Sequence, residues 1–141
     1  MTDFFISYAR EDKLFVERLY SKLDDRDYKA WVDWEGIPLS AEWLQEIYSA
    51  IDSADSFVFI ISPDSIASEI CRLELDHAIK RHKRLIPILH KETGSTKIPE
   101  AIASLNWLFI RESDDLDKSV NDFVSVINTD LDRVRAHTRQ S

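Results

Sequence analysis

The most apolar stretch of the chain is Phe57–Ile61, and its character limits the folds that the protein can adopt. Every residue in it is β-branched or aromatic, so a strand built from it would be apolar on both faces. Such strands are typical of parallel sheets that helices cover on both sides. Turn and helix-start residues follow at once in Ser62–Ser65. The sequence therefore predicts a buried strand and then a helix that reaches about Lys80 in one or two pieces.

A carboxylate interrupts the apolar face of this predicted helix. On a wheel of about 100° per residue, one broad apolar arc contains Ile70, Cys71, Leu73, Leu75, Ala78 and Ile79. Glu74 falls near the middle of that arc. A carboxylate in such a position must pair with a cation, carry a raised pKa or face a cleft.

Two interpretations of Glu74 stay open at this point. In the first, the end of the helix tilts the carboxylate into solvent or places it against a partner such as an arginine. In the second, Glu74 is a working carboxylate, because open α/β sheets bind their ligands beyond the carboxyl ends of their strands.

Segments typical of strands and helices alternate along the whole chain. Short apolar segments that predict buried strands lie at residues 4–8, 28–33, 55–61, 84–89 and 107–110. Helical periodicity or helix-start residues occur at 9–25, 40–51, 62–80, 98–105 and 116–131. Pro87 lacks an amide hydrogen, so we expect a sheet edge or a bulge beside it. The alternation predicts a parallel sheet with helices on both faces.

Composition narrows the class of protein. A chain of 141 residues, 44% of them hydrophobic, is long enough for one domain with a real core. Its net charge of −8 argues against sequence-independent nucleic-acid binding and against a polybasic membrane patch. A single cysteine fits a reducing compartment, and neither a signal peptide nor a long apolar run is visible. We therefore expect a soluble, cytoplasmic protein with no nucleic-acid or membrane partner.

Common cofactor and metal motifs are absent from the sequence. With Gly36 and Gly94 as its only glycines, the chain has no glycine-rich phosphate-binding loop. Its four histidines are scattered, and no group of residues has metal-ligand spacing, so we expect no metal site.

The last residues differ in charge from the rest of the chain. Residues 133–141 contain three arginines and no acidic residue, and no helix-stop signal precedes them. They are either a frayed terminus or the start of a connector to a further domain, and we favour the connector. The predicted domain then covers residues 1–132.

Several short motifs resemble, in the right order, the signatures of TIR (Toll/interleukin-1 receptor) domains. They are Phe5–Tyr8 with Asp12, Trp31–Asp33 with Ile37, Pro38 and Trp43, Ile61–Ser65, Cys71 with Glu74 and Leu75, and Asn106–Trp107. The resemblance covers about residues 3–130, and the tail is similar to that of bacterial TIR proteins that continue into a sensor domain. It implies a flavodoxin-like three-layer α/β sandwich, in which helices cover both faces of a five-stranded parallel sheet.

The resemblance also implies an activity. Many bacterial and plant TIR domains cleave NAD+ at the nicotinamide–ribose bond, as effector modules of defence proteins that form homo-oligomers with other TIR domains on activation. The products are nicotinamide and ADP-ribose or a cyclic ADP-ribose isomer, and NAD+ is a substrate, not a cofactor. The essential glutamate of those enzymes matches Glu74. The matching substrate-binding candidates are Tyr8, Arg10, Asp33, Trp34, Ile37, Trp43, Ser62 and Cys71.

A single carboxylate suits this chemistry. Nicotinamide is already cationic on its ribose and leaves as a neutral molecule, so no acid is needed to protonate the leaving group, unlike in ordinary glycosidases. One carboxylate near the ribose can stabilise an oxocarbenium-like transition state. Arg10 would then meet the diphosphate, and Tyr8 or Trp34 would stack on a ring.

Each of the other candidates also has an interpretation without a ligand. Core packing accounts for Tyr8 and Trp34 as well as stacking does. Asp33 fits a turn acceptor, and Cys71 fits a small buried hydrophobe, which is the interpretation we favour for the cysteine.

Three alternatives remain for the whole domain. The first is a non-catalytic scaffold that joins TIR domains to one another. The second is a nucleoside-cleaving transferase of related architecture, which also uses a glutamate. The third, a phosphoacceptor receiver domain, is disfavoured because Ser7–Ala9 and Ser62 occupy positions at which that chemistry requires acidic residues.

Overall fold

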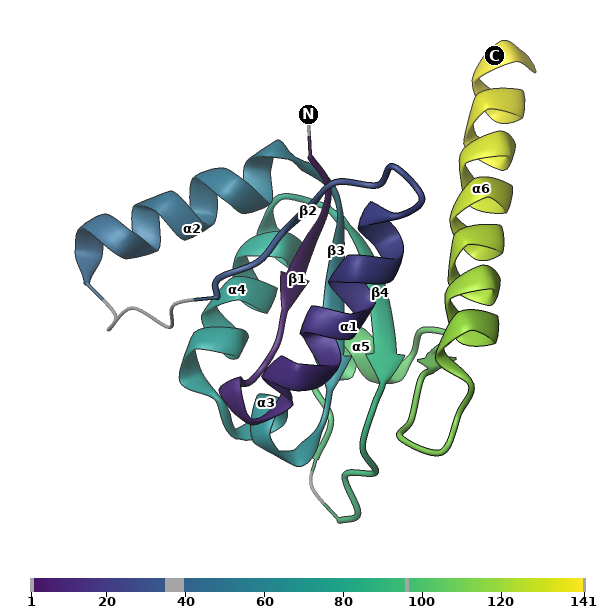
Figure 1. Ribbon diagram of the computed structural model, residues 1–141. Coiled ribbons are helices and arrows are strands. Elements are labelled where there is room, and N and C mark those ends of the chain that lie inside the picture. Colours follow the sequence, from purple (N-terminus) through teal and green to yellow (C-terminus); the bar gives the residue numbers. More distant parts are fainter. Residues whose placement is uncertain (1, 35–39, 96, 141) are drawn as a thin grey trace.

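A five-stranded parallel sheet forms the centre of the protein (Figure 1). The computed structural model describes residues 2–34, 40–95 and 97–140, with side chains up to Asn128. The sheet has the strand order β2-β1-β3-β4-β5. Its strands are β1 (Thr2–Ser7), β2 (Ala30–Trp31), β3 (Ala54–Ile61), β4 (Arg84–Leu89) and β5 (Leu108–Phe109).

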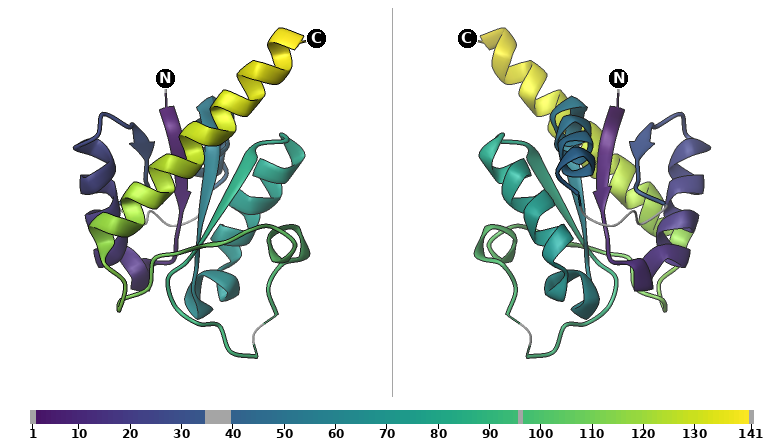
Figure 2. Two further views of the ribbon diagram at one scale, coloured as in Figure 1. Left: turned by 90° about the vertical axis from the view of Figure 1, so that its right-hand side faces the viewer. Right: turned by 90° about the vertical axis from the view of Figure 1, so that its left-hand side faces the viewer.

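Helices cover both faces of this sheet. They are the 3₁₀ helix η1 (Arg10–Asp12), α1 (Lys13–Asp24), α2 (Ala41–Ser53), α3 (Pro63–Ala67), α4 (Glu69–Lys80), α5 (Glu100–Ala103) and α6 (Leu116–Gln140). Side chains of α1 and α6 pack on one face, and those of α2, α4 and α5 on the other. The two side views of Figure 2 show α6 in front of the sheet in one and behind it in the other. The strand order is the flavodoxin-like one, and the predicted fold class is confirmed.

The alternation of side chains along the strands divides the core in two. In β1, Phe4 and Ile6 belong to the cluster under α1 and α6, while Phe5 belongs to the cluster under α2 and α4. β3 is buried along nearly all of its length, because it lies between β1 and β4 with helices on both faces. The prediction of a central strand at Phe57–Ile61 is confirmed.

The two edge strands are shorter than predicted. β2 comprises Ala30–Trp31 instead of residues 28–33, and β5 comprises Leu108–Phe109 instead of 107–110. Each has a partner strand on one side only, so less pairing holds the flanking residues extended. β4 matches its predicted bounds. On the side of β4 that faces β5, the pairing covers Ile88 and Leu89 only, so among the described residues Pro87 has no strand partner on that side.

Most helices start where the sequence predicts. Ser40 caps α2, since its hydroxyl accepts a hydrogen bond from the Trp43 amide at 3.1 Å.

The final helix extends to Gln140, past the predicted end at residue 131. The interpretation of residues 133–141 as the start of a connector stays a prediction. Across the described residues, no helix combines the length and the apolar character needed to cross a bilayer.

Candidate functional site

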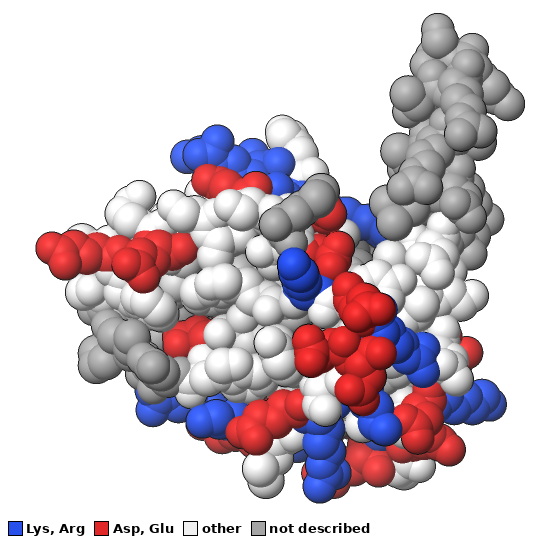
Figure 3. All heavy atoms as spheres, turned by 45° about the horizontal axis from the view of Figure 1, so that its top comes forward, with Lys and Arg blue, Asp and Glu red and all other residues white. Residues whose placement is uncertain are grey.

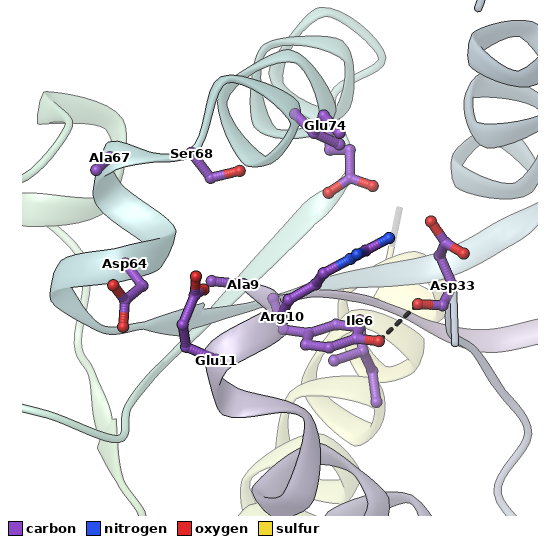
Figure 4. A pocket seen from close by; sticks show the side chains of 11 residues that line it. Ile6, Ala9, Arg10, Glu11, Asp33, Asp64, Ala67, Ser68 and Glu74 are labelled. Atoms are coloured by element: carbon purple, nitrogen blue, oxygen red, sulfur yellow. Dashed lines mark hydrogen bonds between the residues drawn. The ribbon is translucent and has the colours of Figure 1, made fainter. Parts of the chain in front are cut away.

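A cleft of about 470 Å³ opens at the carboxyl ends of the strands (Figure 4). Three separate parts of the chain line it: Tyr8–Glu11 after β1, Asp33 after β2, and the segment from Asp64 to Glu74 after β3. This is the point in the strand order where β1 and β3 lie side by side and their connections run to opposite faces. Open α/β sheets bind their ligands at such a point.

Glu74 reaches this cleft from α4. Its side chain is 5% exposed, and the Ser7 hydroxyl donates a hydrogen bond to Glu74 Oε1 at 2.8 Å. Burial raises the pKa of Glu74 from its ordinary 4.5 to about 8; the hydrogen bond from Ser7 works against this shift, and the charge of Asp33 adds to it. Glu74 therefore has a raised pKa and also lines the cleft. These are two of the three possibilities that the sequence left open for a carboxylate on an apolar helix face.

A break between two helices directs Glu74 into the cleft. Ser62 caps α3 by accepting a hydrogen bond from the Ser65 amide, and the Ser65 hydroxyl oxygen in turn accepts one from the Ser62 amide. Ser68 then caps α4 by accepting from the Cys71 amide at 3.2 Å. The predicted helix is thus in two pieces. Because α4 has its own N-cap, it starts as a separate helix and does not have to continue along the axis of α3.

Tyr8 and Asp33 join the ends of β1 and β2 across the cleft. The Tyr8 hydroxyl donates a hydrogen bond to the backbone oxygen of Asp33 at 2.5 Å. Burial first, and then the Asp33 carboxylate, raise the pKa of Tyr8 to about 12, so the phenol stays a neutral donor. In Figure 4, the side chain of Arg10 extends along the cleft toward the carboxylates of Glu74 and Asp33.

The tryptophans among the candidates lie outside this cleft. Trp34 packs at 6.2 Å from the Tyr8 ring and edge-on at 5.4 Å from Tyr20, and it lines a separate shallow hollow. Trp43 packs at 6.3 Å from Trp31, over the opposite face of the sheet. Ile37 lies outside the described residues.

Ser62 and Cys71 are buried behind the cleft and do not line it. Ser62 is fully buried, and its hydroxyl donates to Asp12 Oδ2 at 2.5 Å. Cys71 is 1% exposed and belongs to the apolar cluster under α4. Burial, followed by the charge of Glu74, raises the pKa of its thiol to about 12, so the sulfur stays protonated. This environment agrees with the interpretation of Cys71 as a small buried hydrophobe.

Two features of the site were missed by sequence reasoning. Ser7, which touches Glu74, is the one polar residue at the end of an otherwise apolar run, and that contrast was a usable signal. The second is an ion pair in which Lys91 Nζ lies 3.0 Å from Asp12 Oδ1, whose side chain is fully buried. Nothing in the sequence links these residues, because only the sheet brings the ends of β1 and β4 together.

Figure 3 shows acidic and basic side chains interspersed over one face of the molecule. Within the described part of the chain, no group of three or more histidine, cysteine, aspartate or glutamate side chains is placed to hold a metal ion.

Comparison with known proteins decides the family. The family model described as "TIR domain" matches residues 4–124. The chain belongs to the TIR domain family. Part of it is also 31% identical, over 96 residues, to the 2' cyclic ADP-D-ribose synthase BtTIR of Bacteroides thetaiotaomicron. That match covers 64% of this chain and 33% of BtTIR, so it spans about a third of the curated relative.

Solved structures agree on the fold of this TIR domain. The TIR domain of the Toll-related receptor TRR-2 from Hydra magnipapillata superposes with a TM-score of 0.67 at 23% identity, covering 94% of this chain and 97% of that one. The TIR domains of the activated Roq1 resistosome give a TM-score of 0.69 at 16% identity, covering 90% and 99%. At these identities the likeness establishes the fold alone.

The ion pair between Asp12 and Lys91, which lines a separate hollow, is expected to stabilise the TIR domain. Lys91→Met keeps most of the aliphatic stem and leaves the Asp12 carboxylate buried with the Ser62 hydroxyl. Hydrogen bonds to charged groups contribute about 1.5–3 kcal/mol. Because the Lys91 side chain is 37% exposed, we expect the free energy of unfolding to fall by about 1–2 kcal/mol in urea denaturation.

Lys22→Met is the matched control. Lys22 Nζ lies 2.7 Å from Asp117 Oδ1, but both side chains of that pair are exposed, at 39% and 68%. Exposed ion pairs contribute little, so this variant should lose much less stability than Lys91→Met. Equal losses would show that burial of Asp12 does not increase the contribution of its ion pair to the free energy of unfolding.

The raised pKa of Glu74 predicts how Glu74→Gln changes stability with pH. Since the folded pKa is about 8 and the ordinary value is 4.5, the contribution of Glu74 to stability is fully present below about pH 4.5. It is lost as the pH rises through 8, where the buried side chain must ionise. Glutamine cannot ionise, so the Tm of Glu74→Gln relative to the parent should be higher at pH 9 than at pH 5. A difference in Tm that stays constant with pH would contradict the desolvation of Glu74.

Proposed function

We propose that this TIR domain cleaves NAD+ at the nicotinamide–ribose bond, releasing nicotinamide and ADP-ribose or a cyclic ADP-ribose isomer. The observation that carries the proposal is Glu74: a carboxyl group in the wall of the cleft, buried, and in the described residues hydrogen-bonded to Ser7 rather than paired with a cation. The similarity to BtTIR, a 2' cyclic ADP-D-ribose synthase, supports it.

The proposed reaction breaks one C–N bond. The electron pair of the bond between ribose C1' and the nicotinamide nitrogen moves to that nitrogen, which becomes neutral, so the leaving group needs no proton. Positive charge develops on the ribose, and the Glu74 carboxylate stabilises it within a site that is partly removed from water. The oxygen of water, or of a hydroxyl of the ADP-ribose itself, then bonds to C1' and loses its proton.

The pKa of Glu74 suits this role. A carboxyl group that titrates near 8 is ionised often enough to stabilise the cation and is basic enough to take up the proton that the attacking oxygen loses. A carboxylate with an ordinary pKa near 4.5 would be a much weaker base.

Neighbouring residues supply binding groups for the rest of NAD+ in this proposal. The guanidinium of Arg10 binds the diphosphate, and the Tyr8 ring offers a surface for a base or for nicotinamide. Asp33, on the wall opposite Glu74, accepts hydrogen bonds from ribose hydroxyls. Trp34 contributes through its contact with Tyr8. The binding roles of Trp43 and Ile37 stay predictions from the family resemblance. No resident cofactor or metal is part of the proposal, since NAD+ is the substrate.

The biological setting forms a further part of the proposal. We place the domain in the cytoplasm, as the effector module of a bacterial defence protein, and covalently linked to a sensor domain beyond residue 132. Activation would bring TIR domains together as a homo-oligomer. The match to only a third of BtTIR and the fold shared with the TIR domains of an activated resistosome are consistent with this setting.

Glu74→Gln tests the proposed chemistry. It keeps the size of the side chain and removes the charge, so turnover should fall by at least the ~10²–10³-fold that is typical when one electrostatic stabiliser is removed. Nicotinamide release is measured by chromatography of reactions with NAD+ and, separately, with nucleosides. Glu69→Gln, an exposed position on the same helix, is the control and should change the rate less than about twofold.

The same assay separates the proposal from its alternatives. A folded Glu74→Gln variant that cleaves NAD+ at the parent rate would rule out Glu74 as the catalytic residue. A parent protein that releases no nicotinamide at any concentration would favour the non-catalytic scaffold. Release of free base from nucleosides, but not from NAD+, would favour the nucleoside-cleaving alternative.

Assembly should change the rate. If TIR domains must associate to become active, specific activity should rise with protein concentration and rise further when the domain is clustered by fusion to an oligomer. Initial rates across a hundredfold range of concentration, with light scattering on the same samples, provide the measurement. A flat profile from purely monomeric samples would count against activation by assembly.

A further inference from the structure

Ser7 and Glu74 form a buried polar contact between the sheet and α4 at the inner wall of the cleft. Ser7 is the last residue of β1 and is 1% exposed, and its backbone is held in register with Phe59 of β3. Its hydroxyl lies 2.8 Å from Glu74 Oε1, and both partners are buried. A donor on a fixed strand therefore holds one oxygen of a side chain that has several rotatable bonds.

This contact fixes the orientation of the carboxyl group. With Oε1 engaged by Ser7, the other oxygen, Oε2, remains available to a ligand in the cleft, because no described residue bonds to it. Without the hydroxyl, the carboxyl group would be free to rotate about its terminal bond, which has a broad energy minimum. A misdirected stabilising charge costs rate, since catalysis depends on placement within fractions of an ångström.

The other groups that face Glu74 do not replace Ser7. Cys71, one turn earlier on α4, has a thiol whose pKa is raised to about 12, so it carries no charge. Asp33, from the end of β2, opposes ionisation of Glu74. From the segment after β1, Tyr8 is a neutral phenol bonded to the backbone of Asp33, and Arg10 lines the cleft as the one cation among these groups. Of the described residues, Ser7 alone donates a hydrogen bond to the carboxyl group of Glu74.

We infer that Ser7 is a positioning residue for the proposed cleavage: its hydroxyl aims the Glu74 carboxylate at the ribose and favours the ionised form. This inference rests on the proposed function for its effect on rate, but the contact itself can be tested without NAD+. Ser7 acts through Glu74 and does not touch the reacting atoms. The rate and the pH at which Glu74 ionises should therefore change together when the hydroxyl is removed.

Ser7→Ala is the test, with turnover of NAD+ measured from pH 6 to 9.5 against an enzyme-free blank. A hydrogen bond to a charged group is worth about one pH unit or more in its pKa. The acidic limb of kcat/KM, which reports the ligand-free enzyme, should therefore move from about pH 8 to about pH 9, which lowers kcat/KM about tenfold at pH 7 and less above pH 9. Ser56→Ala removes another buried strand hydroxyl, on β3 and away from the cleft, and should leave the limb in place.

A second measurement keeps this inference separate from the proposed function. The titration of Glu74 is followed by ¹³C NMR of glutamate-labelled protein, with the resonance assigned by its absence in Glu74→Gln. Ser7→Ala should raise the midpoint by about one pH unit or more, whether or not NAD+ is cleaved. An unchanged midpoint, or a lower kcat/KM with its pH limb unmoved, would overturn the inference. A shifted midpoint in a protein that never cleaves NAD+ would support the contact and refute the proposed function.

Discussion

The removal of one carboxyl group from water is the constraint on which the site depends. Glu74 lies on the face of α4 that packs against the sheet, where solvent has little access. The same apolar packing that stabilises the fold raises the pKa of this side chain, and one hydrogen bond from Ser7 limits the shift. Fold and site are therefore parts of one arrangement: a change that let water reach α4 would weaken both.

Precise placement of this group comes from the ends of elements. Ser62 and Ser68 each cap a short helix, and the break between α3 and α4 gives α4 its own direction. Below them, Asp12 holds the Ser62 hydroxyl and the Lys91 ammonium, joining the chain after β1 to the chain after β3 and β4. The cleft is thus built from loops that are tied to one another, although loops are commonly the most mobile parts of a domain.

The sequence predicted the features that arise from local pattern. Phe57–Ile61 was recognised as a central strand because its side chains are apolar on both faces, and Glu74 stood out because it interrupts an apolar arc. The cap at Ser40 followed from residue type alone. Strand ends at the sheet edges did not follow, because pairing decides where β2 and β5 stop.

Contacts between distant segments were beyond the reach of pattern. Asp12 and Lys91 meet only because β1 and β4 flank β3, and no periodicity encodes that meeting. Aromatic residues were equally ambiguous, since the same ring can pack in a core or line a ligand site. Tyr8 lies on the cleft, whereas Trp34 and Trp43 pack against other rings outside it.

The alternation of side chains at the end of β1 has a mechanical consequence. Ser7 points toward the layer that contains α4, while its neighbour Tyr8 packs against the layer that contains α1. The cleft therefore straddles the rim of the sheet, with one wall attached to each layer of helices. The width of the cleft depends on the distance between the two helix layers, which the core side chains determine. A change in the size of a buried core side chain would therefore change the distance between the two walls of the cleft.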